Sequence, residues 1–359
     1  MEIGIPKEIK DHEYRVGATP AGVAQLTARG HEVRVQSGAG ARIGFGDEQY
    51  RQTGALVVDS AERVYAESEM ILKVKEPQPA EYDLLQPQQL LFCYLHLAPE
   101  PQLTAALLNR RVTGVAFETV TDALGQLPLL TPMSEIAGRL AVQAGAQALQ
   151  PINGGRGVLL SGAPGVPPAR VLILGSGVVG TQAARIALGM GADVTILDID
   201  PARLRQLDDL FALRAKTAYS DPATLGTLLR ETDLLIGAVL IPGKLAPHLV
   251  SRSMVASMLP GSAIVDVAID QGGCVESARP TTHSQPMYVD QGVVHYCVAN
   301  MPAAAARTAT QALALATLPY ALRIADLGWD KAAARDPGLA AGLNTAGGQL
   351  VHPALRAAA

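Results

Sequence analysis

The fold of this chain is decided by one stretch, Arg170-Val171-Leu172-Ile173-Leu174-Gly175-Ser176-Gly177-Val178-Val179-Gly180. The run 171–174 is continuous and apolar, as in a strand that helices cover on both faces. Three glycines with GxGxxG spacing follow at once, and residues 178–190 have a helical pattern. A strand, a tight turn and a helix in this order open a βαβ unit. The stretch therefore predicts an α/β domain with a parallel sheet.

The glycines of this turn suit a phosphate ligand. Gly175 allows the tight turn, Gly177 lets the backbone approach a pyrophosphate, and Gly180 lets the helix pack close to the strand. The helix N-terminus at Val178 adds N–H donors and the positive end of a helix dipole. Because the motif has a strand before it and a helix after it, it predicts a bound dinucleotide.

An acidic residue after the next strand indicates which dinucleotide binds. The predicted strand 193–197 is followed by Asp198, 18 residues beyond Gly180. A carboxylate at this place can accept hydrogen bonds from both ribose hydroxyls and repels a 2′-phosphate, which favours NAD over NADP. Arg203 follows Asp198 by five residues and could weaken the exclusion of NADP. The pattern still predicts NAD as the cofactor.

Short apolar runs rich in β-formers alternate with helical patterns along the whole chain, which is typical of parallel α/β sheets. A first series of predicted strands covers 2–5, 32–36, 70–75, 90–96 and 112–117. A second series covers 170–174, 193–197, 234–239, 263–269 and 293–298. Helices are expected at 20–30, where Thr19 can cap the start and Gly30 the end, and at 134–150 and 302–327.

A chain of 359 residues is too long for one core and predicts two domains. The long helix 302–327 follows the last strand, and the remaining tail is too short to form a domain of its own. We therefore expect a discontinuous substrate domain, 1–128 plus 307–359, and a Rossmann-like nucleotide domain, 129–306. Both are expected to be doubly wound parallel sheets, with a cleft between them.

Composition excludes several classes of protein. Apolar residues make up 48% and charged residues 17%, which does not indicate disorder. A net charge of -4 gives no basic surface for nucleic acid. No apolar run approaches the roughly 20 residues of a membrane span, and the N-terminus lacks a signal-peptide pattern. The cysteines Cys93, Cys274 and Cys297 are isolated from one another. A reduced, cytoplasmic protein is expected.

Four charged or titratable residues lie at or beyond predicted strand ends, where ligands bind in parallel sheets. They are Arg15, Lys75, His96 and Asp270. Each of them also has a structural explanation without function. Arg15 or Lys75 could be a solvated charge, His96 a hydrogen-bonded structural histidine, and Asp270 a turn former. Lys73 points the same way as Lys75, so the strand period does not choose between them. We prefer Lys75 because it is nearer the strand's carboxyl end.

Together the four side chains form a coherent set for a small amino or keto acid. A guanidinium can bind a carboxylate through two hydrogen bonds. An ammonium can polarise a carbonyl oxygen, a histidine can carry protons near neutral pH, and a carboxylate can orient or activate water. The set therefore predicts an amino-acid or keto-acid site that faces a nicotinamide ring.

The sequence resembles the NAD-dependent alanine dehydrogenases over essentially its whole length. The resemblance lies in these segments: 4–8 (GIPKE), 15–16 (RV), 19–20 (TP), 72–77 (LKVKEP), 95–97 (LHL), 132–135 (PMSE), 154–157 (GGRG), 266–273 (DVAIDQGG), 279–282 (RPTT) and 298–302 (VANMP). It implies reversible deamination of L-alanine to pyruvate and ammonia with NAD. It also implies a homo-oligomer, most often a hexamer.

The resemblance implies a role for individual residues of this chain. Arg15 and Lys75 would hold the substrate, and His96 and Asp270 would be the catalytic acid/base residues. Besides the glycine turn, the implied cofactor contacts are Ser134, Val178, Asp198, Arg203, Ser220, Val239, Leu240, Val267, Ala268, Ile269, Asp270, Arg279, Val298, Ala299, Asn300 and Met301. Some relatives hold a divalent ion near the end of the long C-terminal helix, but the stretch 323–327 lacks the acid and histidine pair. No metal is predicted.

Other functions compete with this interpretation. The NAD-binding component of a proton-translocating transhydrogenase shares the two-domain plan, but it would need a membrane partner and would not turn over an amino acid. A silent NAD-binding module would not explain the four strand-end residues. A lysine-forming dehydrogenase of the same broad superfamily is the remaining alternative.

Overall fold

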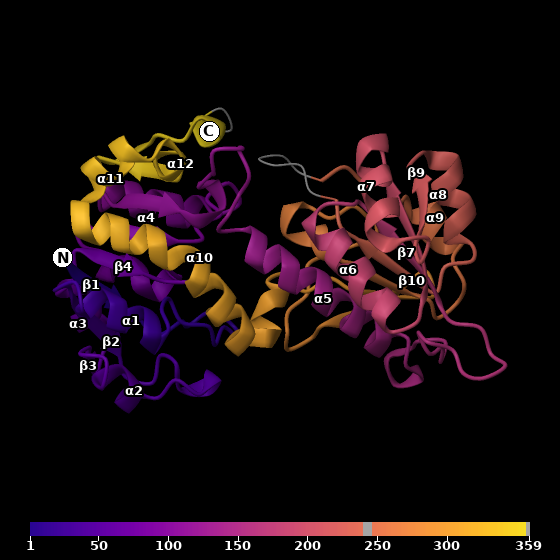
Figure 1. The fold of residues 1–359 in the computed structure, drawn as a ribbon, viewed down its shortest axis with the longest axis horizontal. Helices are drawn as coiled ribbons and strands as arrows, with labels where there is room; N and C mark the ends of the chain where they lie inside the picture. The colour runs from indigo at the N-terminus through magenta and orange to yellow at the C-terminus, as the bar shows by residue number, and fades with distance from the viewer. Residues whose placement is uncertain (240–245, 357–359) are drawn as a thin grey trace. The chain divides into compact units, whose positions relative to one another are not determined.

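The computed structural model describes residues 1–239 and 246–356, so Leu240, an expected cofactor contact, lies outside the described residues. The chain divides into two compact units (Figure 1). Unit 1 comprises 1–133 and 305–359, and unit 2 comprises 134–304. Among the described residues, no helix has the length and apolar character needed to cross a membrane.

The described part of unit 1 contains an eight-stranded sheet in the order β15-β14-β6-β5-β4-β1-β2-β3. Strands β1 to β6 are parallel, whereas β14 is antiparallel to β6 and β15. The strands are β1 (Glu2–Ile5), β2 (Glu32–Gln36), β3 (Leu56–Val58), β4 (Met70–Leu72), β5 (Leu90–Cys93), β6 (Thr113–Ala116), β14 (Leu343–Ala346) and β15 (Gln349–Leu350).

Helices and 3₁₀ turns connect these strands. Helix α1 begins after Thr19, whose hydroxyl accepts from Gly22 N at 3.1 Å, and α1 lies beside α10 (Figure 1). One face of the sheet packs on α3 and α4 in an apolar cluster that includes Ile71 and Leu91. The helices are α1 (Pro20–Thr27), α2 (Asp47–Arg51), α3 (Ala61–Ala66), α4 (Pro101–Asn109), α10 (Ala306–Leu327), α11 (Trp329–Arg335), α12 (Pro337–Ala340) and α13 (Pro353–Arg356), with 3₁₀ turns η1 (Ala41–Ile43), η2 (Pro79–Leu84) and η3 (Phe117–Thr119).

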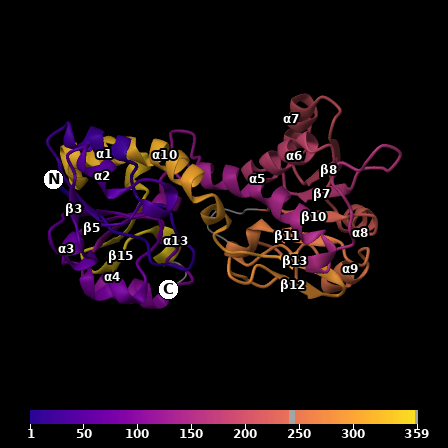
Figure 2. The same ribbon diagram turned by 90° about the horizontal axis from the view of Figure 1, so that it is seen from below.

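The described part of unit 2 contains a seven-stranded sheet in the order β12-β13-β11-β10-β7-β8-β9. All neighbours are parallel except β12 and β13, which are antiparallel; Figure 2 shows β13 between β11 and β12. The strands are β7 (Arg170–Leu174), β8 (Asp193–Asp198), β9 (Lys216–Tyr219), β10 (Leu234–Gly237), β11 (Ala263–Asp266), β12 (Met287–Asp290) and β13 (Val293–Tyr296).

Alternate residues of the unit 2 strands enter two different cores, as the period of a strand requires. Val171 and Ile173 pack with residues of α5, α6 and α7 on one face. Leu172 and Leu174 pack with residues of α8 and α9 on the other. The helices are α5 (Thr131–Ala148), α6 (Val178–Gly189), α7 (Pro201–Phe211), α8 (Pro222–Leu229) and α9 (Arg252–Ala256), with 3₁₀ turns η4 (Pro151–Asn153), η5 (Val267–Gln271) and η6 (Met301–Ala305).

These two mostly parallel sheets confirm the predicted α/β class, but several predicted strands were too long. Strand β4 ends at Leu72 and not at Lys75, and β5 ends at Cys93 and not at His96. Strand β11 ends at Asp266, so Asp270 lies in the 3₁₀ turn η5 and not at a strand end. The apolar sequence continues past the last ladder pair of β5 and β11, and the residues after β4 are buried although two of them are lysines, so burial beyond a strand made these strands look longer than they are.

Candidate functional site

The charged residues of unit 1 follow adjacent strands at one edge of its sheet. The loop after β1 carries Arg15, the segment after β4 carries Lys75, and the segment after β5 carries His96. In the sheet β5, β4 and β1 are neighbours, and the strand order changes direction between β1 and β4. Ligands of open α/β sheets bind at such a switch point, beyond the carboxyl ends of the strands.

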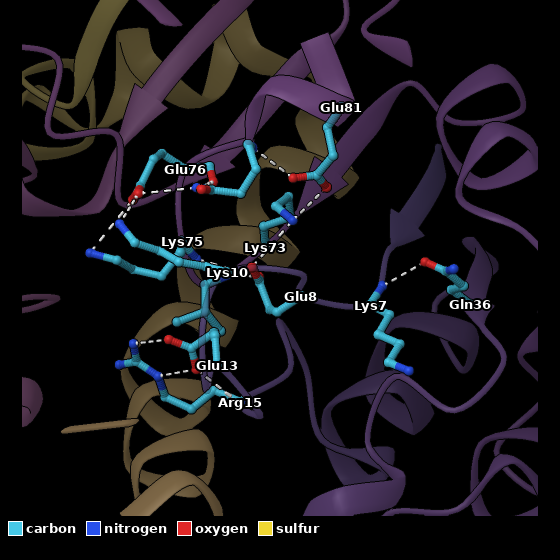
Figure 3. Close-up of polar contacts among 12 residues, drawn as sticks. Lys7, Glu8, Lys10, Glu13, Arg15, Gln36, Lys73, Lys75, Glu76 and Glu81 are labelled. Atoms are coloured by element: carbon cyan, nitrogen blue, oxygen red, sulfur yellow. Dashed lines mark hydrogen bonds and ion pairs between the residues drawn. The ribbon is translucent and has the colours of Figure 1, made fainter. Parts of the chain in front are cut away.

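Arg15 is buried and held by Glu13 (Figure 3). Arg15 Nε donates to Glu13 Oε1 at 2.7 Å, and Nη2 donates to Oε2. The backbone N–H of Arg15 also donates to Oε1, at 3.0 Å, and Nη1 contacts the sulfur of Met133 at 3.1 Å. One edge of the guanidinium therefore binds the Glu13 carboxylate, while Nη1, on the other edge, faces Met133.

The two lysines of the segment after β4 have different surroundings. Lys73 is completely buried, and its ammonium lies 2.8 Å from Glu81 Oε1 and 3.2 Å from Glu8 Oε2. The Lys75 side chain is 10% exposed, and its Nζ lies 3.5 Å from Glu76 Oε2. Two carboxylates thus engage Lys73 inside the unit, which leaves Lys75 as the better candidate for a substrate contact (Figure 3).

Glu76 links two cations. Besides Lys75, it accepts a hydrogen bond from Lys10 Nζ, on the loop after β1. Burial opposes ionisation of Glu76, but Lys75, Lys10 and His96 together lower its pKa to about 2. Glu76 is therefore a carboxylate at any physiological pH, and it connects the Lys75 segment to the Lys10 loop.

His96 has an unusual backbone conformation that directs its imidazole. Its φ is 47°, in the left-handed region, where non-glycine residues are uncommon. The Glu118 carboxylate accepts the N–H of His96 at 2.6 Å and lies 3.8 Å from Nδ1. The imidazole stacks on Tyr94, with ring centroids 5.7 Å apart, and the side chain is 38% exposed. A strained backbone at such a place is typical of functional sites.

Glu8 fixes the backbone of the lysine segment. Its Oε1 accepts the N–H of Val74 at 2.7 Å and that of Lys75 at 3.4 Å, while Oε2 faces the Lys73 ammonium. Complete burial raises the pKa of Glu8 to about 7, although Lys73 opposes the rise. Glu8 therefore exchanges a proton near neutral pH inside unit 1.

We expect Glu8→Gln to gain stability relative to the wild type as the pH rises from 5 to 8. Unfolding returns the pKa of Glu8 from about 7 to 4.5, so the folded wild type holds a proton that it must release over this range. The expected gain is roughly 2 to 3 kcal/mol. Thermal melting of both proteins at each pH measures it.

The matched control is Glu67→Gln, because Glu67 is exposed and hydrogen bonds from Arg34 and Arg63 lower its pKa below the range. The difference in stability between Glu67→Gln and the wild type should be the same at pH 5 and pH 8. If the stability of Glu8→Gln changes with pH as that of the wild type does, Glu8 does not titrate between pH 5 and pH 8.

The glycine turn of unit 2 has the shape that a dinucleotide requires. Gly175 has a φ of 99°, which favours glycine. A Cβ built at Gly180 would lie 1.9 Å from Gly175 O, whereas one at Gly177 meets no atom within 4 Å. Gly177 precedes the first residue of the 12-residue helix α6. Open space beside a helix N-terminus fits a pyrophosphate, so these residues fit the expected cofactor.

Asp198, the last residue of β8, is bound to the glycine turn. Ser176 N donates to its Oδ2 at 2.7 Å, the Ser176 hydroxyl donates to the same oxygen, and Asp200 N donates to Oδ1 at 2.9 Å. Partial burial opposes ionisation, but these hydrogen bonds lower the pKa of Asp198 below its ordinary value. Arg203 donates to Ser176 O, so a cation also lies beside the turn.

Asp270 is exposed in the 3₁₀ turn η5, and the turn is fixed by a second aspartate. Asp266 is completely buried and accepts the N–H groups of Ala268, Cys274 and Val275 at 3.1, 2.9 and 3.2 Å. Burial raises the pKa of Asp266 to about 6, against these hydrogen bonds. Asp266 thus orients the turn that carries Asp270.

The other expected cofactor contacts lie on several elements of unit 2. Ser134 is on α5, Ser220 follows β9, and Val239 follows β10. Arg279 stacks over the Tyr288 ring at 4.2 Å. Val267, Ala268 and Ile269 lie in η5, and Val298, Ala299 and Asn300 follow β13, where Asn300 has a φ of 71° and Met301 begins η6.

Sequence reasoning missed four carboxylates of unit 1: Glu8, Glu13, Glu76 and Glu118. Glu118 follows β6 in the 3₁₀ turn η3, so the strand-end rule that found His96 also applied to it. Glu13 and Glu76 stand two residues and one residue from predicted cations, and this proximity was the available signal. Glu8 had no such signal. In 1–239 and 246–356, no cluster of three or more His, Cys, Asp or Glu side chains could hold a metal ion.

The chain is similar to known proteins along nearly its whole length. A family model described as "Alanine dehydrogenase/PNT, N-terminal domain" matches 4–137, and the corresponding C-terminal domain model matches 141–353. The alanine dehydrogenase of Halomonas elongata is 54% identical, over 99% of this chain and 96% of the relative.

Two solved structures are similar as well. An L-alanine dehydrogenase matches with a TM-score of 0.96 and 54% identity, and the match covers 100% of this chain and 99% of that one. A transhydrogenase from Sinorhizobium meliloti matches with a TM-score of 0.85 and 27% identity, covering 98% and 100%.

Proposed function

The chain belongs to the alanine dehydrogenase/PNT family, and from this premise we propose that it converts L-alanine, NAD and water reversibly to pyruvate, ammonia and NADH. Its similarity to the Halomonas elongata enzyme, 54% identity over nearly the full length of both chains, is the observation that carries the proposal. The amino-acid dehydrogenase activity and the nicotinamide cofactor follow from the family. We propose the choice of NAD and the roles of the individual residues.

At the substrate, the proposed roles follow from the chemistry of each group. Arg15 binds the carboxylate through the guanidinium edge that Glu13 does not occupy, and so orients the α-carbon. When bound, NAD accepts the hydrogen of the α-carbon together with its electron pair. His96 and Asp270 move the protons while water adds to the resulting substrate imine and ammonia leaves. Lys75 stabilises the oxygen that becomes the carbonyl of pyruvate.

Arg15→Lys is expected to raise the KM for pyruvate about 10- to 100-fold, because an ammonium cannot bind Glu13 and the substrate with the geometry of a guanidinium and each charge-assisted hydrogen bond contributes roughly 1.5–3 kcal/mol. The turnover number should change less. Steady-state reduction of pyruvate with ammonia and NADH measures both parameters. An unchanged KM would mean that Arg15 does not bind the carboxylate.

The proposal of NAD as the cofactor depends on Asp198. We expect Asp198→Ala to raise the ratio of kcat/KM with NADPH to that with NADH by about 10- to 100-fold, since one nearby like charge repels the phosphate by roughly 1–3 kcal/mol. Asp193→Asn, at the other end of the same strand, is the matched control and should leave the ratio unchanged. An unchanged ratio in Asp198→Ala would contradict the role.

A substrate panel tests the proposed function itself. NADH formation at 340 nm is measured with L-alanine, serine, glycine and lysine at equal concentration. L-alanine should give the highest kcat/KM, and lysine should give almost none. A preference for lysine, or no turnover of any amino acid, would overturn the proposal.

The match to a transhydrogenase favours one other candidate, the NAD-binding component of such an enzyme. That function requires exchange of reducing equivalents between two nicotinamide dinucleotides and no amino acid. Turnover of L-alanine by the purified chain alone would decide against it.

We further propose that the protein is a homo-oligomer, most simply a hexamer, and that it acts in the cytoplasm. The oligomer is proposed from the resemblance to alanine dehydrogenases, and the cytoplasmic location from the composition of the sequence and its isolated cysteines. Size-exclusion chromatography with light scattering measures the assembly, and a monomer at micromolar concentration would contradict it.

A further inference from the structure

We infer that Glu13 is a positioning residue for the proposed reaction, which holds the Arg15 guanidinium in the orientation that binds the substrate carboxylate. The inference rests on the proposed function of Arg15. It concerns a residue that touches the reaction only through Arg15, and it follows from the contacts between the two side chains (Figure 3).

Glu13 binds Arg15 at three points. Its Oε1 accepts both the backbone N–H of Arg15, at 3.0 Å, and Nε, at 2.7 Å, while Oε2 accepts Nη2. The side chains are 0% and 2% exposed. Because the same carboxylate binds the start and the end of the arginine, the guanidinium has one orientation relative to its own backbone.

The fixed orientation turns one edge of the guanidinium to Glu13 and the other edge away from it. Nη1 lies on the edge away from Nε, and it contacts the Met133 thioether at 3.1 Å. A thioether is a weak acceptor, which a carboxylate oxygen outcompetes. Glu13 therefore determines which guanidinium edge a substrate carboxylate meets.

Charge supports the same role. Burial alone would disfavour the guanidinium cation, but the carboxylate of Glu13 raises the pKa of Arg15 above its ordinary value. A buried charge is strongly destabilised when its partner is removed. Without Glu13, the arginine is expected to leave the orientation that suits the substrate.

The test is a double-mutant cycle of Glu13→Gln, Arg15→Lys and the double variant. Glutamine has nearly the same volume as glutamate, but its amide group places N–H donors against the guanidinium and keeps only one acceptor. The Kd for pyruvate is measured by titration calorimetry with NADH present, and KM and kcat are measured in parallel.

We expect Glu13→Gln to raise the Kd and KM for pyruvate at least about tenfold, with kcat within about threefold of the wild type and the NADH Kd unchanged. In the Arg15→Lys background the same change should add less than about twofold, because the group that Glu13 positions is already gone. A wild-type Kd in folded Glu13→Gln, or a full additional loss in the double variant, would overturn the inference.

Glu81→Gln is the matched control for a merely structural effect. Glu81 is a buried carboxylate of the same unit, and its ion pair is with Lys73. It should lower the melting temperature and leave the pyruvate Kd unchanged. If Glu13→Gln behaves in the same way, Glu13 only stabilises the fold.

If Glu13→Gln does not fold, Glu13→Asp replaces it in the same binding measurement. It keeps the charge but shortens the side chain, so it should fold and still raise the pyruvate Kd about threefold or more, whereas an unchanged Kd would overturn the inference. Failure of the proposed function is distinguishable: the wild type would then not oxidise L-alanine, whereas the binding cycle would still report on Glu13 and Arg15.

Discussion

The protein with His96→Ala is expected to lose about 10²- to 10⁴-fold in kcat for L-alanine oxidation, the range typical of a removed general acid or base. Its NADH Kd should remain that of the wild type, because the glycine turn and Asp198 belong to unit 2. Glu118 and Tyr94 position the imidazole through contacts that alanine cannot make. Stopped-flow or steady-state rates and NADH fluorescence titration measure the two quantities.

The control for this variant is His31→Ala. His31 belongs to the same unit, but its Nε2 binds Asp326 at 2.9 Å on α10, away from the segment of His96. We expect its kcat to stay within about twofold of the wild type, because His31 precedes β2 at the amino ends of the parallel strands, whereas His96 follows the carboxyl end of β5. Equal losses of turnover and NADH affinity in His96→Ala would instead indicate a structural histidine.

Gly180→Ala is the substitution with the largest expected effect on stability. The added methyl group would lie 1.9 Å from Gly175 O and 3.3 Å from Ile173 Cγ2, so either the turn at Gly175 or α6 must move. Overpacking of this kind costs roughly 1–3 kcal/mol and sometimes more. We expect a lower melting temperature and loss of measurable NADH binding, recorded by calorimetry and NADH fluorescence.

Gly177→Ala, three positions before Gly180 in the same glycine turn, is the matched control. Its φ is −64°, which alanine adopts freely, and its added Cβ meets no atom within 4 Å. The variant should therefore melt like the wild type but bind NADH about tenfold or more weakly, because the methyl group occupies the approach of the pyrophosphate. Wild-type NADH binding in Gly177→Ala would place the cofactor elsewhere.

The central strands of both sheets could be predicted from the sequence because their pattern is local. The boundaries 2–5, 32–36 and 170–174 agree with the structure. Short strands at or next to the sheet edges were missed: β3, β9, β12, β14 and β15 were not predicted. Edge strands such as β9, with the sequence Lys-Thr-Ala-Tyr, bury little apolar surface, so their sequence lacks the continuous apolar run of a central strand.

Candidate site residues could be selected from the sequence where one residue's chemistry and its place after a strand were enough. Arg15, Lys75 and His96 were selected in this way, and their roles stay predictions. Their carboxylate partners were not selected, because pairing depends on tertiary contacts. The strand period left Lys73 and Lys75 equivalent, and Lys75 was preferred only for its place nearer the strand's carboxyl end; in the structure, Glu8 and Glu81 engage Lys73. The choice of alanine came from family resemblance and not from any spacing.

The central claim is that this chain removes the α-hydrogen of L-alanine to a nicotinamide and releases pyruvate and ammonia. Its most direct test uses L-alanine deuterated at the α-carbon, with NAD, and mass spectrometry of the products. The claim predicts deuterium in the reduced cofactor, with pyruvate and ammonia formed in equal amounts. Reduced cofactor without deuterium, or no reduction of NAD at all, would contradict it.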